Sequence, residues 1–301
     1  MKWFKPFEKE LTGTRDITDR ELLLSLLKEL NLEDKFELVL NREGTQFDRT
    51  IKYNGTKLVR IDLSQLELSK LPEGINKFEM LEYLDISRNI LLELPVSIGD
   101  FKYLKELDVG YNPPLSHLPD SIGSLSNLTY LGLYGCGLKN LPDSIGDLKN
   151  LILLNVSKNE LTYFPESFGS LSKLEKVYVE QNQLTNLPES INGCQNLIEL
   201  KLSQNKLQTI PSSIFQIKKF TQLKFDYNEI RELPEGLIAE GMHITELSFD
   251  KNQLESLPEG LDKLERLATL RVNHNPLTQL TDSVEESIAL LKRRGCNVAH
   301  R

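Results

Sequence analysis

Apolar residues recur along most of this chain in a pattern that returns every 23 or 24 positions. Within one unit, aliphatic residues stand two positions apart, as in the segment Leu151-Ile-Leu-Leu154-Asn-Val156. Alternate side chains of a β-strand point to the same face, so each unit predicts one short strand with a buried and an exposed face. One such unit cannot bury its leucines alone, and the repetition therefore predicts units that stack around one continuous core.

Two further residue series run in phase with the leucines. Nine prolines share the spacing: Pro72, Pro95, Pro119, Pro142, Pro165, Pro188, Pro211, Pro234 and Pro258. Each proline disfavours a long helix, so we expect extended chain or 3₁₀ turns on the return path. Eight asparagines follow the strand segments, and Cys136 fills the one gap between them: Asn89, Asn112, Asn159, Asn182, Asn205, Asn228, Asn252 and Asn275. Their amides are expected to pair with backbone groups of the turn that leaves each strand.

The combined pattern, Leu-x-x-Leu-x-Leu-x-x-Asn-x-Leu-x-x-Leu-Pro, resembles the leucine-rich repeat family over residues 58–280. The segment Leu141-Pro-Asp-Ser-Ile-Gly-Asp-Leu148 is similar to its 23-residue class, found in Scribble-like, Ras-suppressor-like, plant Ras-group and many bacterial repeat proteins. The resemblance implies an α/β solenoid of about ten repeats, curved, with a parallel sheet on its concave side. It also implies a scaffold that binds other proteins, as in signal transduction.

Three parts of the chain follow from this reading: an N-terminal capping segment at 1–57, ten repeats at 58–280, and a capping helix and tail at 281–301. The capping box Thr18-Asp-Arg-Glu21 predicts a helix at about 19–31. Short strands are expected at 36–40 and 50–53, with pairing to the sheet edge at Leu58. The segment Asp282-Ser-Val-Glu285 predicts a second helix that ends near Arg294. Both helices are expected to cover the ends of the stack, and the first could also dock a partner.

Side chains that flank the inward leucines are expected to project from the concave face. Six of the nine tyrosines occupy such positions: Tyr83, Tyr111, Tyr130, Tyr134, Tyr178 and Tyr227. Tyrosine is enriched in binding hot spots, although it is also common in strands for structural reasons. Leu153 falls in the same column as Tyr130 and adds an apolar group. Gly132 and Gly135, beside Tyr134, predict an open depression at this point.

One exposed column also changes in charge along the chain. Asp62, Asp85 and Asp108 stand at its beginning, and Lys201, Lys224 and Arg271 stand toward its end. Such a column could orient a partner of complementary charge, although acidic residues in neighbouring columns interrupt it. The predicted partner-binding residues are therefore Tyr83, Asp85, Asp108, Tyr111, Tyr130, Tyr134, Leu153, Tyr178, Lys201, Lys224, Tyr227 and Arg271.

The composition adds little chemistry to this picture. A net charge of −8 over 301 residues disfavours a nucleic-acid binder that tracks phosphates. The sequence holds neither a long apolar run nor an apolar N-terminal leader, so no membrane partner is expected and a cytoplasmic location is favoured over secretion. Three cysteines and four histidines, far apart, form no recognisable metal or catalytic motif. We therefore expect no cofactor, no metal and no enzymatic activity.

The function that the sequence favours is a non-catalytic module that binds a protein or peptide on its concave face. A monomer is the expected state. One alternative is a regulatory or substrate-selecting arm of a signalling enzyme, in a small GTPase or ubiquitin pathway. A second alternative is an extracellular recognition or adhesion protein.

Overall fold

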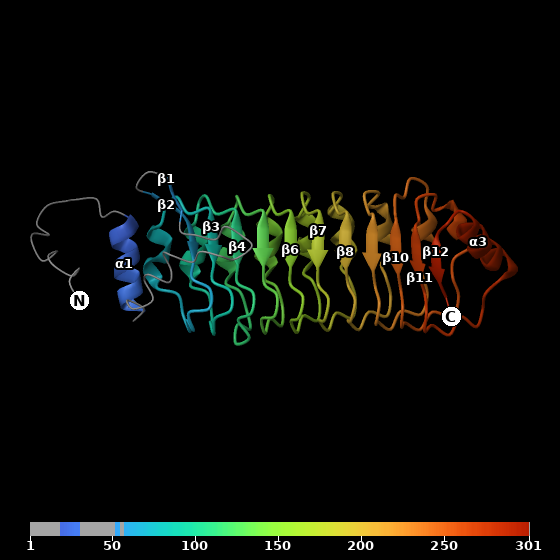
Figure 1. Cartoon of the computed structure of the whole chain (residues 1–301), viewed down its shortest axis with the longest axis horizontal. Helices are drawn as coiled ribbons and strands as arrows, with labels where there is room; N and C mark the ends of the chain where they lie inside the picture. Colours follow the sequence, from blue (N-terminus) through green and yellow to red (C-terminus); the bar gives the residue numbers. More distant parts are fainter. Residues whose placement is uncertain (1–18, 31–51, 55–56, 301) are drawn as a thin grey trace, which may run out of the picture.

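The computed structural model describes residues 19–30, 52–54 and 57–300, which form one elongated solenoid (Figure 1). Each repeat contributes one strand and one return segment, and the strands of successive repeats lie side by side. The strands are β1 (Lys52–Asn54), β2 (Lys57–Asp62), β3 (Tyr83–Asp85), β4 (Glu106–Asp108), β5 (Tyr130–Gly132), β6 (Leu153–Asn155), β7 (Lys176–Tyr178), β8 (Glu199–Lys201), β9 (Gln222–Lys224), β10 (Glu246–Ser248), β11 (Thr269–Arg271) and β12 (Asn297–Ala299).

All twelve strands of the described chain belong to one sheet in which spatial order follows sequence order. The strands from β2 to β12 are parallel, and only β1 runs antiparallel to its neighbour. Part of the strand expected at 50–53 lies outside the described residues, but Tyr53 does pair with Leu58. The strand expected at 36–40 lies outside them entirely. Strand β12 was not predicted from the sequence.

The return segments are 3₁₀ helices, as the repeated prolines predicted. They are η2 (Glu73–Lys77), η3 (Val96–Asp100), η4 (Asp120–Ser124), η5 (Asp143–Asp147), η6 (Glu166–Ser170), η7 (Glu189–Gly193), η8 (Ser212–Gln216), η9 (Glu235–Ile238) and η10 (Leu261–Lys263). Proline precedes the first residue of each of them from η2 to η9. These helices form the side of the solenoid opposite the sheet.

The core lies between the sheet and the 3₁₀ helices and continues through all repeats. Inward residues such as Leu131, Leu154 and Leu200 are fully buried. The phenylalanines Phe78, Phe101, Phe225 and Phe249 are buried in the core as well. Two of these rings, Phe225 and Phe249, stack at a centroid distance of 5.1 Å. Burial of this kind is the main stabilising contribution to the fold.

The asparagine series forms the predicted ladder of hydrogen bonds. Asn89 Nδ2 donates to the carbonyl oxygens of Leu63 and Ile86, and Asn89 Oδ1 accepts from the N–H groups of Leu66 and Leu68. The same arrangement recurs in later repeats, where each amide joins its own turn to the preceding repeat. Cys136 takes this position, and its Sγ donates to the Val109 carbonyl at 3.4 Å.

Helices lie at both ends of the stack. In α1 (Asp19–Glu29), Leu23 and Leu26 are buried in the core, and the Asp19 carboxylate accepts a hydrogen bond from the Leu58 N–H. Thr18, the first residue of the expected capping box, lies outside the described residues. In α3 (Asp282–Arg293), the buried side chains are Val284, Ser287, Ile288 and Leu291. Neither helix, nor any other in the described part of the chain, is long and apolar enough to cross a lipid bilayer.

Candidate functional site

The parallel register aligns equivalent side chains into columns on the concave face. Tyr83, Glu106, Tyr130 and Leu153 follow one another along the first column, because each pairs with the next across neighbouring strands. Asp85, Asp108 and Gly132 stand in the adjacent column by the same pairing. Residues that follow the strands, such as Tyr111 and Tyr134, extend the face toward the asparagine ladder. The candidate site is this concave face.

Two tyrosines from neighbouring repeats contact each other near the middle of the face. The rings of Tyr111 and Tyr134 pack edge to face with centroids 5.0 Å apart, and Tyr111 remains 43% exposed. Arg88 lies over the Tyr111 ring at 4.6 Å, and Lys158 lies over the Tyr134 ring at 5.2 Å. A hydrogen bond with Tyr134 raises the pKa of Lys158 above its usual value. Both rings are therefore held in place without being buried.

Three other tyrosines of the face, Tyr83, Tyr178 and Tyr227, also carry a cation on the ring. Arg60 lies over Tyr83 at 4.2 Å, and Lys251 lies over Tyr227 at 4.4 Å. Lys201 lies over Tyr178 at 4.4 Å, while the Tyr178 hydroxyl donates to Glu199. Burial, followed by the hydrogen bond to Glu199, raises the pKa of Tyr178 to about 12. Lys201 was among the predicted site residues, whereas Arg60 and Lys251 were not, because repeat spacing does not specify which long side chain lies over a neighbouring ring.

The depression expected at Gly132 and Gly135 is absent, and the prediction was wrong. A Cβ atom placed on Gly132 would lie 2.6 Å from the Tyr130 hydroxyl. The space beside Gly135 is taken by the Tyr111 ring, 3.3 Å from the position of a Cβ atom. Each glycine therefore makes room for a neighbouring tyrosine. Gly135 also has a φ of 68°, at the turn position where Tyr111 has a φ of 58°.

The acidic half of the charged column has a structural role in its own turns. Asp85 Oδ1 accepts a hydrogen bond from the Ser87 N–H at 3.0 Å, and Asp108 Oδ1 accepts one from the Gly110 N–H at 2.9 Å. Such contacts between a side chain and the backbone two residues later are typical of aspartate in turns. Both side chains are half-buried, so they also remain part of the concave surface.

The basic half of the same column is neutralised by acidic side chains of the face. Lys201 pairs with Glu199 at 2.8 Å, Lys224 pairs with Glu246 at 2.8 Å, and Arg271 pairs with Asp250 at 2.6 Å. Burial opposes ionisation of Glu199, but hydrogen bonds from Lys201 and Tyr178 outweigh it, and the Glu199 pKa is lowered. Because each cation has its own counter-ion, the column is far less graded in charge than its sequence indicates.

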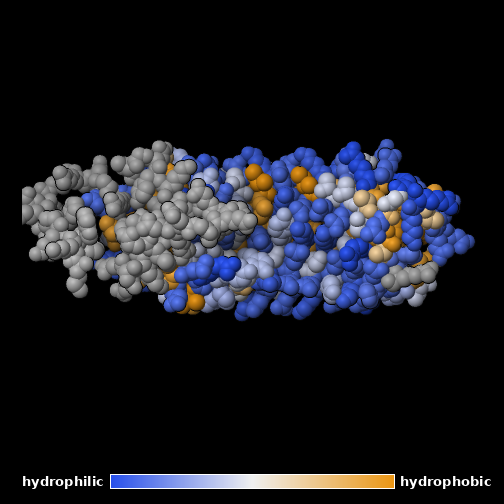
Figure 2. Space-filling view, viewed as in Figure 1, coloured by the Kyte–Doolittle hydropathy of each residue, from blue (hydrophilic) through white to orange (hydrophobic). Residues whose placement is uncertain are grey.

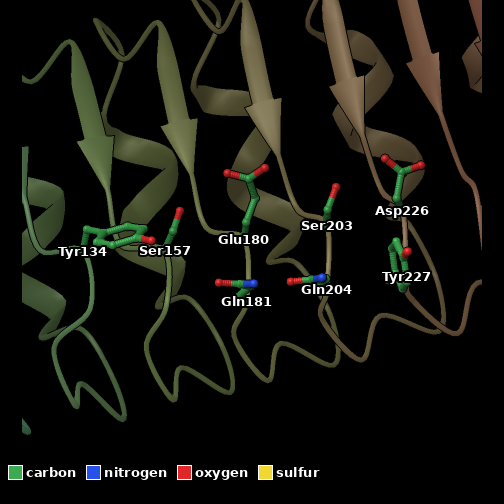
Figure 3. Close-up of a pocket in the computed structure, with 8 residues that line it drawn as sticks. All are labelled: Tyr134, Ser157, Glu180, Gln181, Ser203, Gln204, Asp226 and Tyr227. Atoms are coloured by element: carbon green, nitrogen blue, oxygen red, sulfur yellow. The ribbon is translucent and has the colours of Figure 1, made fainter. Parts of the chain in front are cut away.

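The hollow on this face lies next to the predicted position, between Tyr134 and Tyr227 (Figure 3). This groove has a volume of about 350 Å³ and is lined by Tyr134, Ser157, Glu180, Gln181, Ser203, Gln204, Asp226 and Tyr227. In Figure 3 the two tyrosines stand at its two ends, Glu180 projects between them, and Asp226 stands beside Tyr227. Of these eight residues, only the tyrosines were among the predicted site residues.

The predicted residues are thus spread along the face and do not meet in one cavity. Tyr83 lies on β3, whereas Arg271 lies on β11 and is 53% exposed at its side chain. Leu153 is half-buried on β6, beside Tyr130 in the register. The coloured part of the face shown in Figure 2 is mainly hydrophilic, with separate hydrophobic groups. An extended surface of this kind suits a macromolecule better than a small ligand.

Catalytic chemistry finds little support in the described residues. They contain no group of three or more histidine, cysteine or acidic side chains that could hold a metal ion. Burial raises the pKa of the Cys136 thiol to about 11 and that of the Cys194 thiol to about 12, so neither is a thiolate at neutral pH.

Comparison with known proteins agrees with the architecture. A family model for a leucine-rich repeat region matches residues 115–186. The fold is a leucine-rich repeat solenoid. No curated protein gives a significant match to the sequence.

Solved structures with this fold include two plant receptors in complex with their partners. The chain is 24% identical, with a TM-score of 0.67, to the ectodomain of the Arabidopsis thaliana receptor kinase GASSHO1/SCHENGEN3 in complex with CASPARIAN STRIP INTEGRITY FACTOR 2; 83% of this chain and 32% of that one are covered. It is 27% identical, with a TM-score of 0.58, to the plant peptide hormone receptor RGFR1 in complex with RGF2. This match covers 78% of this chain and 45% of that one.

A bacterial protein has the same fold. The chain is 22% identical, with a TM-score of 0.63, to the functional domain of InlJ from Listeria monocytogenes, with 76% of this chain and 46% of that one covered. The chain therefore spans between a third and a half of the length of these three proteins.

Proposed function

We propose that this protein is a non-catalytic module that binds a protein or peptide through its concave face. The observation that carries the proposal is the set of tyrosines on that face, which are ordered but not buried. Tyr111 and Tyr227 are 43% and 47% exposed, and each ring is fixed by a cation from a neighbouring repeat. Tyrosines in such positions offer apolar area and a hydroxyl group to a partner.

The solenoid supports this function through its rigidity. Neighbouring repeats are joined by sheet hydrogen bonds, by the asparagine ladder and by the shared core. A surface that is already ordered loses little conformational entropy when it binds, so side-chain contacts contribute more fully to the affinity. The two plant receptors of the same fold are in complex with a named factor and with RGF2, which agrees with a protein or peptide partner here.

The proposal is tested by affinity capture from native lysate, followed by an affinity measurement with the captured partner. We expect Tyr130→Ala combined with Tyr134→Ala to lower the affinity by about ten-fold or more, because these two rings lie near the centre of the proposed surface. The thermal unfolding midpoint should stay close to that of the native protein, since neither side chain belongs to the core.

A matched control uses two tyrosines that are not among the concave residues. Tyr103 and Tyr163 are 47% and 49% exposed, so Tyr103→Ala combined with Tyr163→Ala removes the same side chains from outside the proposed surface. This control should bind the partner as the native protein does. Equal affinity of the concave double variant would reject the concave face as the binding surface.

A further inference from the structure

The groove between Tyr134 and Tyr227 is lined by two acidic side chains that form no ion pair within the described part of the chain. Five acidic residues stand at concave positions between β7 and β11: Glu180, Glu199, Asp226, Glu246 and Asp250. Three of them, Glu199, Glu246 and Asp250, form ion pairs. The two that form no ion pair with any described residue are Glu180 and Asp226, and both of them line the groove. Among these five acidic residues, the two without an ion pair to a described residue are thus the two in the groove.

The carboxylates of Asp226 and Glu180 differ in their hydrogen bonds. Asp226 Oδ1 accepts hydrogen bonds from the Ser248 hydroxyl at 2.5 Å and from the Asp250 N–H at 2.8 Å, which fix its orientation. Glu180 is half-buried, and its carboxylate has neither a hydrogen bond nor an ion pair within the described chain. The groove thus combines one anchored carboxylate with one that is open to a ligand (Figure 3).

A second polar group of the groove, besides the Glu180 carboxylate, has no hydrogen-bond partner among the described residues. Ser157 is 3% exposed, and its hydroxyl forms no hydrogen bond within the described residues, although it lines the same hollow. Buried hydroxyl groups are normally paired, so one without a partner at a groove is a position that a ligand atom can satisfy. Beside it, Gln181 and Gln204 present amides that can both donate to and accept from a peptide backbone.

The tyrosines at the ends of the groove already hold lysines of the protein itself. Lys158 lies over the Tyr134 ring and Lys251 lies over the Tyr227 ring, so both rings already take part in cation–π contacts. Neither lysine lines the groove, whose eight lining residues include two acids and not one base. The net charge of −8 of the whole chain attracts cationic partners over longer distances.

We propose that this groove binds an extended, basic peptide segment of the partner, with lysine or arginine side chains facing Glu180 and Asp226. Tyr134 follows β5 and Tyr227 follows β9, which places four strand spacings of ~4.8 Å, or ~19 Å, between them. An extended peptide advances ~3.3 Å per residue, so about six residues fill this length. This inference rests on the proposed function and adds the location, the length and the charge of the bound segment.

The experiment uses a library of random hexapeptides displayed on phage and selected against the full chain. We expect the enriched peptides to be rich in lysine and arginine. The best of them, made synthetically, should lose about ten-fold in affinity for Glu180→Gln, because a charge-assisted contact is removed. Asp226→Asn should also weaken binding, and its circular dichroism spectrum and unfolding midpoint check that the turn after β9 is intact.

The matched control is Glu189→Gln. It removes the same charge from an exposed position in helix η7, outside the groove. It should bind the selected peptide as tightly as the native chain does. Enrichment of neutral or acidic peptides, no enrichment at all, or equal affinity of Glu180→Gln would overturn the inference. If the Tyr130→Ala, Tyr134→Ala variant weakens partner binding while Glu180→Gln does not, the proposed function holds and this inference alone fails.

Discussion

Asn159 illustrates how a single side chain holds two repeats together. Its Oδ1 accepts from the Leu138 N–H at 3.0 Å, and its Nδ2 donates to the carbonyl oxygens of Leu133 and Val156 at 2.8 and 2.9 Å. These groups lie where the chain leaves the sheet, away from the regular ladder. A buried backbone group without a partner costs free energy, so the amide stabilises both its own turn and that of the preceding repeat.

We expect Asn159→Ala to lower the free energy of unfolding by about 1–3 kcal/mol, because several buried backbone groups lose their partner. Asn150→Ala is the matched control: the Asn150 amide donates to the Ser126 carbonyl at 2.7 Å, but this contact is exposed to water. Its loss should cost about 1 kcal/mol or less. Urea denaturation of both variants measures the difference, and equal losses would contradict the role assigned to the buried ladder.

The concave charges show why single residues were difficult to interpret from the sequence. The order of acids and bases along one column indicated a gradient, but Lys201, Lys224 and Arg271 each pair with an acid from another column. Such pairs depend on side-chain conformations across neighbouring strands, which repeat spacing does not specify. The same holds for Gly132, whose free space depends on where the Tyr130 ring lies.

At the scale of elements, the spacing of the 3₁₀ helices explains the repeated Ile-Gly pair. A Cβ atom added to Gly169 in η6 would lie 2.1 Å from the Ser190 carbonyl oxygen in η7. The equivalent glycines of earlier repeats, Gly99, Gly123 and Gly146, would meet the next helix at 2.3, 2.4 and 2.3 Å. Because a Cβ atom does not fit there, glycine permits the helices on the convex side to pack closely.

Gly169→Ala should therefore force η6 and η7 apart and lower the free energy of unfolding by about 1–3 kcal/mol, as overpacking does elsewhere. Gly236→Ala in η9 is the control, since its added Cβ atom would lie 3.3 Å from the nearest atom, Phe215 Cβ, and only a small shift is needed. Thermal unfolding compares the two variants. A loss at Gly169 no larger than that at Gly236 would contradict this packing account.

The elements themselves followed from the sequence to a large extent. The leucines predicted the strands, the asparagines predicted the ladder, and the prolines predicted the 3₁₀ helices. All three recur with the same spacing, because each repeat places the same residues in the same environment. Strand β12 departs from the repeat pattern and therefore could not be recognised by its period. The groove could not be predicted either, since it depends on Glu180, Gln181 and other residues that differ from repeat to repeat.

At the scale of the whole molecule, the repeats form one continuous solenoid with two distinct sides. The convex side consists of closely packed helices, whereas the concave side presents tyrosines, ion pairs and the groove (Figures 1 and 3). The core is continuous from α1 to α3, so a partner bound across several repeats contacts a surface that is held in one arrangement. This is the physical basis of the proposed binding function.

Radical footprinting of tyrosine side chains, read by mass spectrometry with and without the captured partner, tests this claim most directly. The account predicts that binding protects Tyr111, Tyr130 and Tyr134 from modification. Tyr103 and Tyr163, whose exposure is close to that of Tyr111, should be modified to the same extent in the free and bound protein. Protection of Tyr103 and Tyr163, with unchanged modification of the three concave tyrosines, would contradict it.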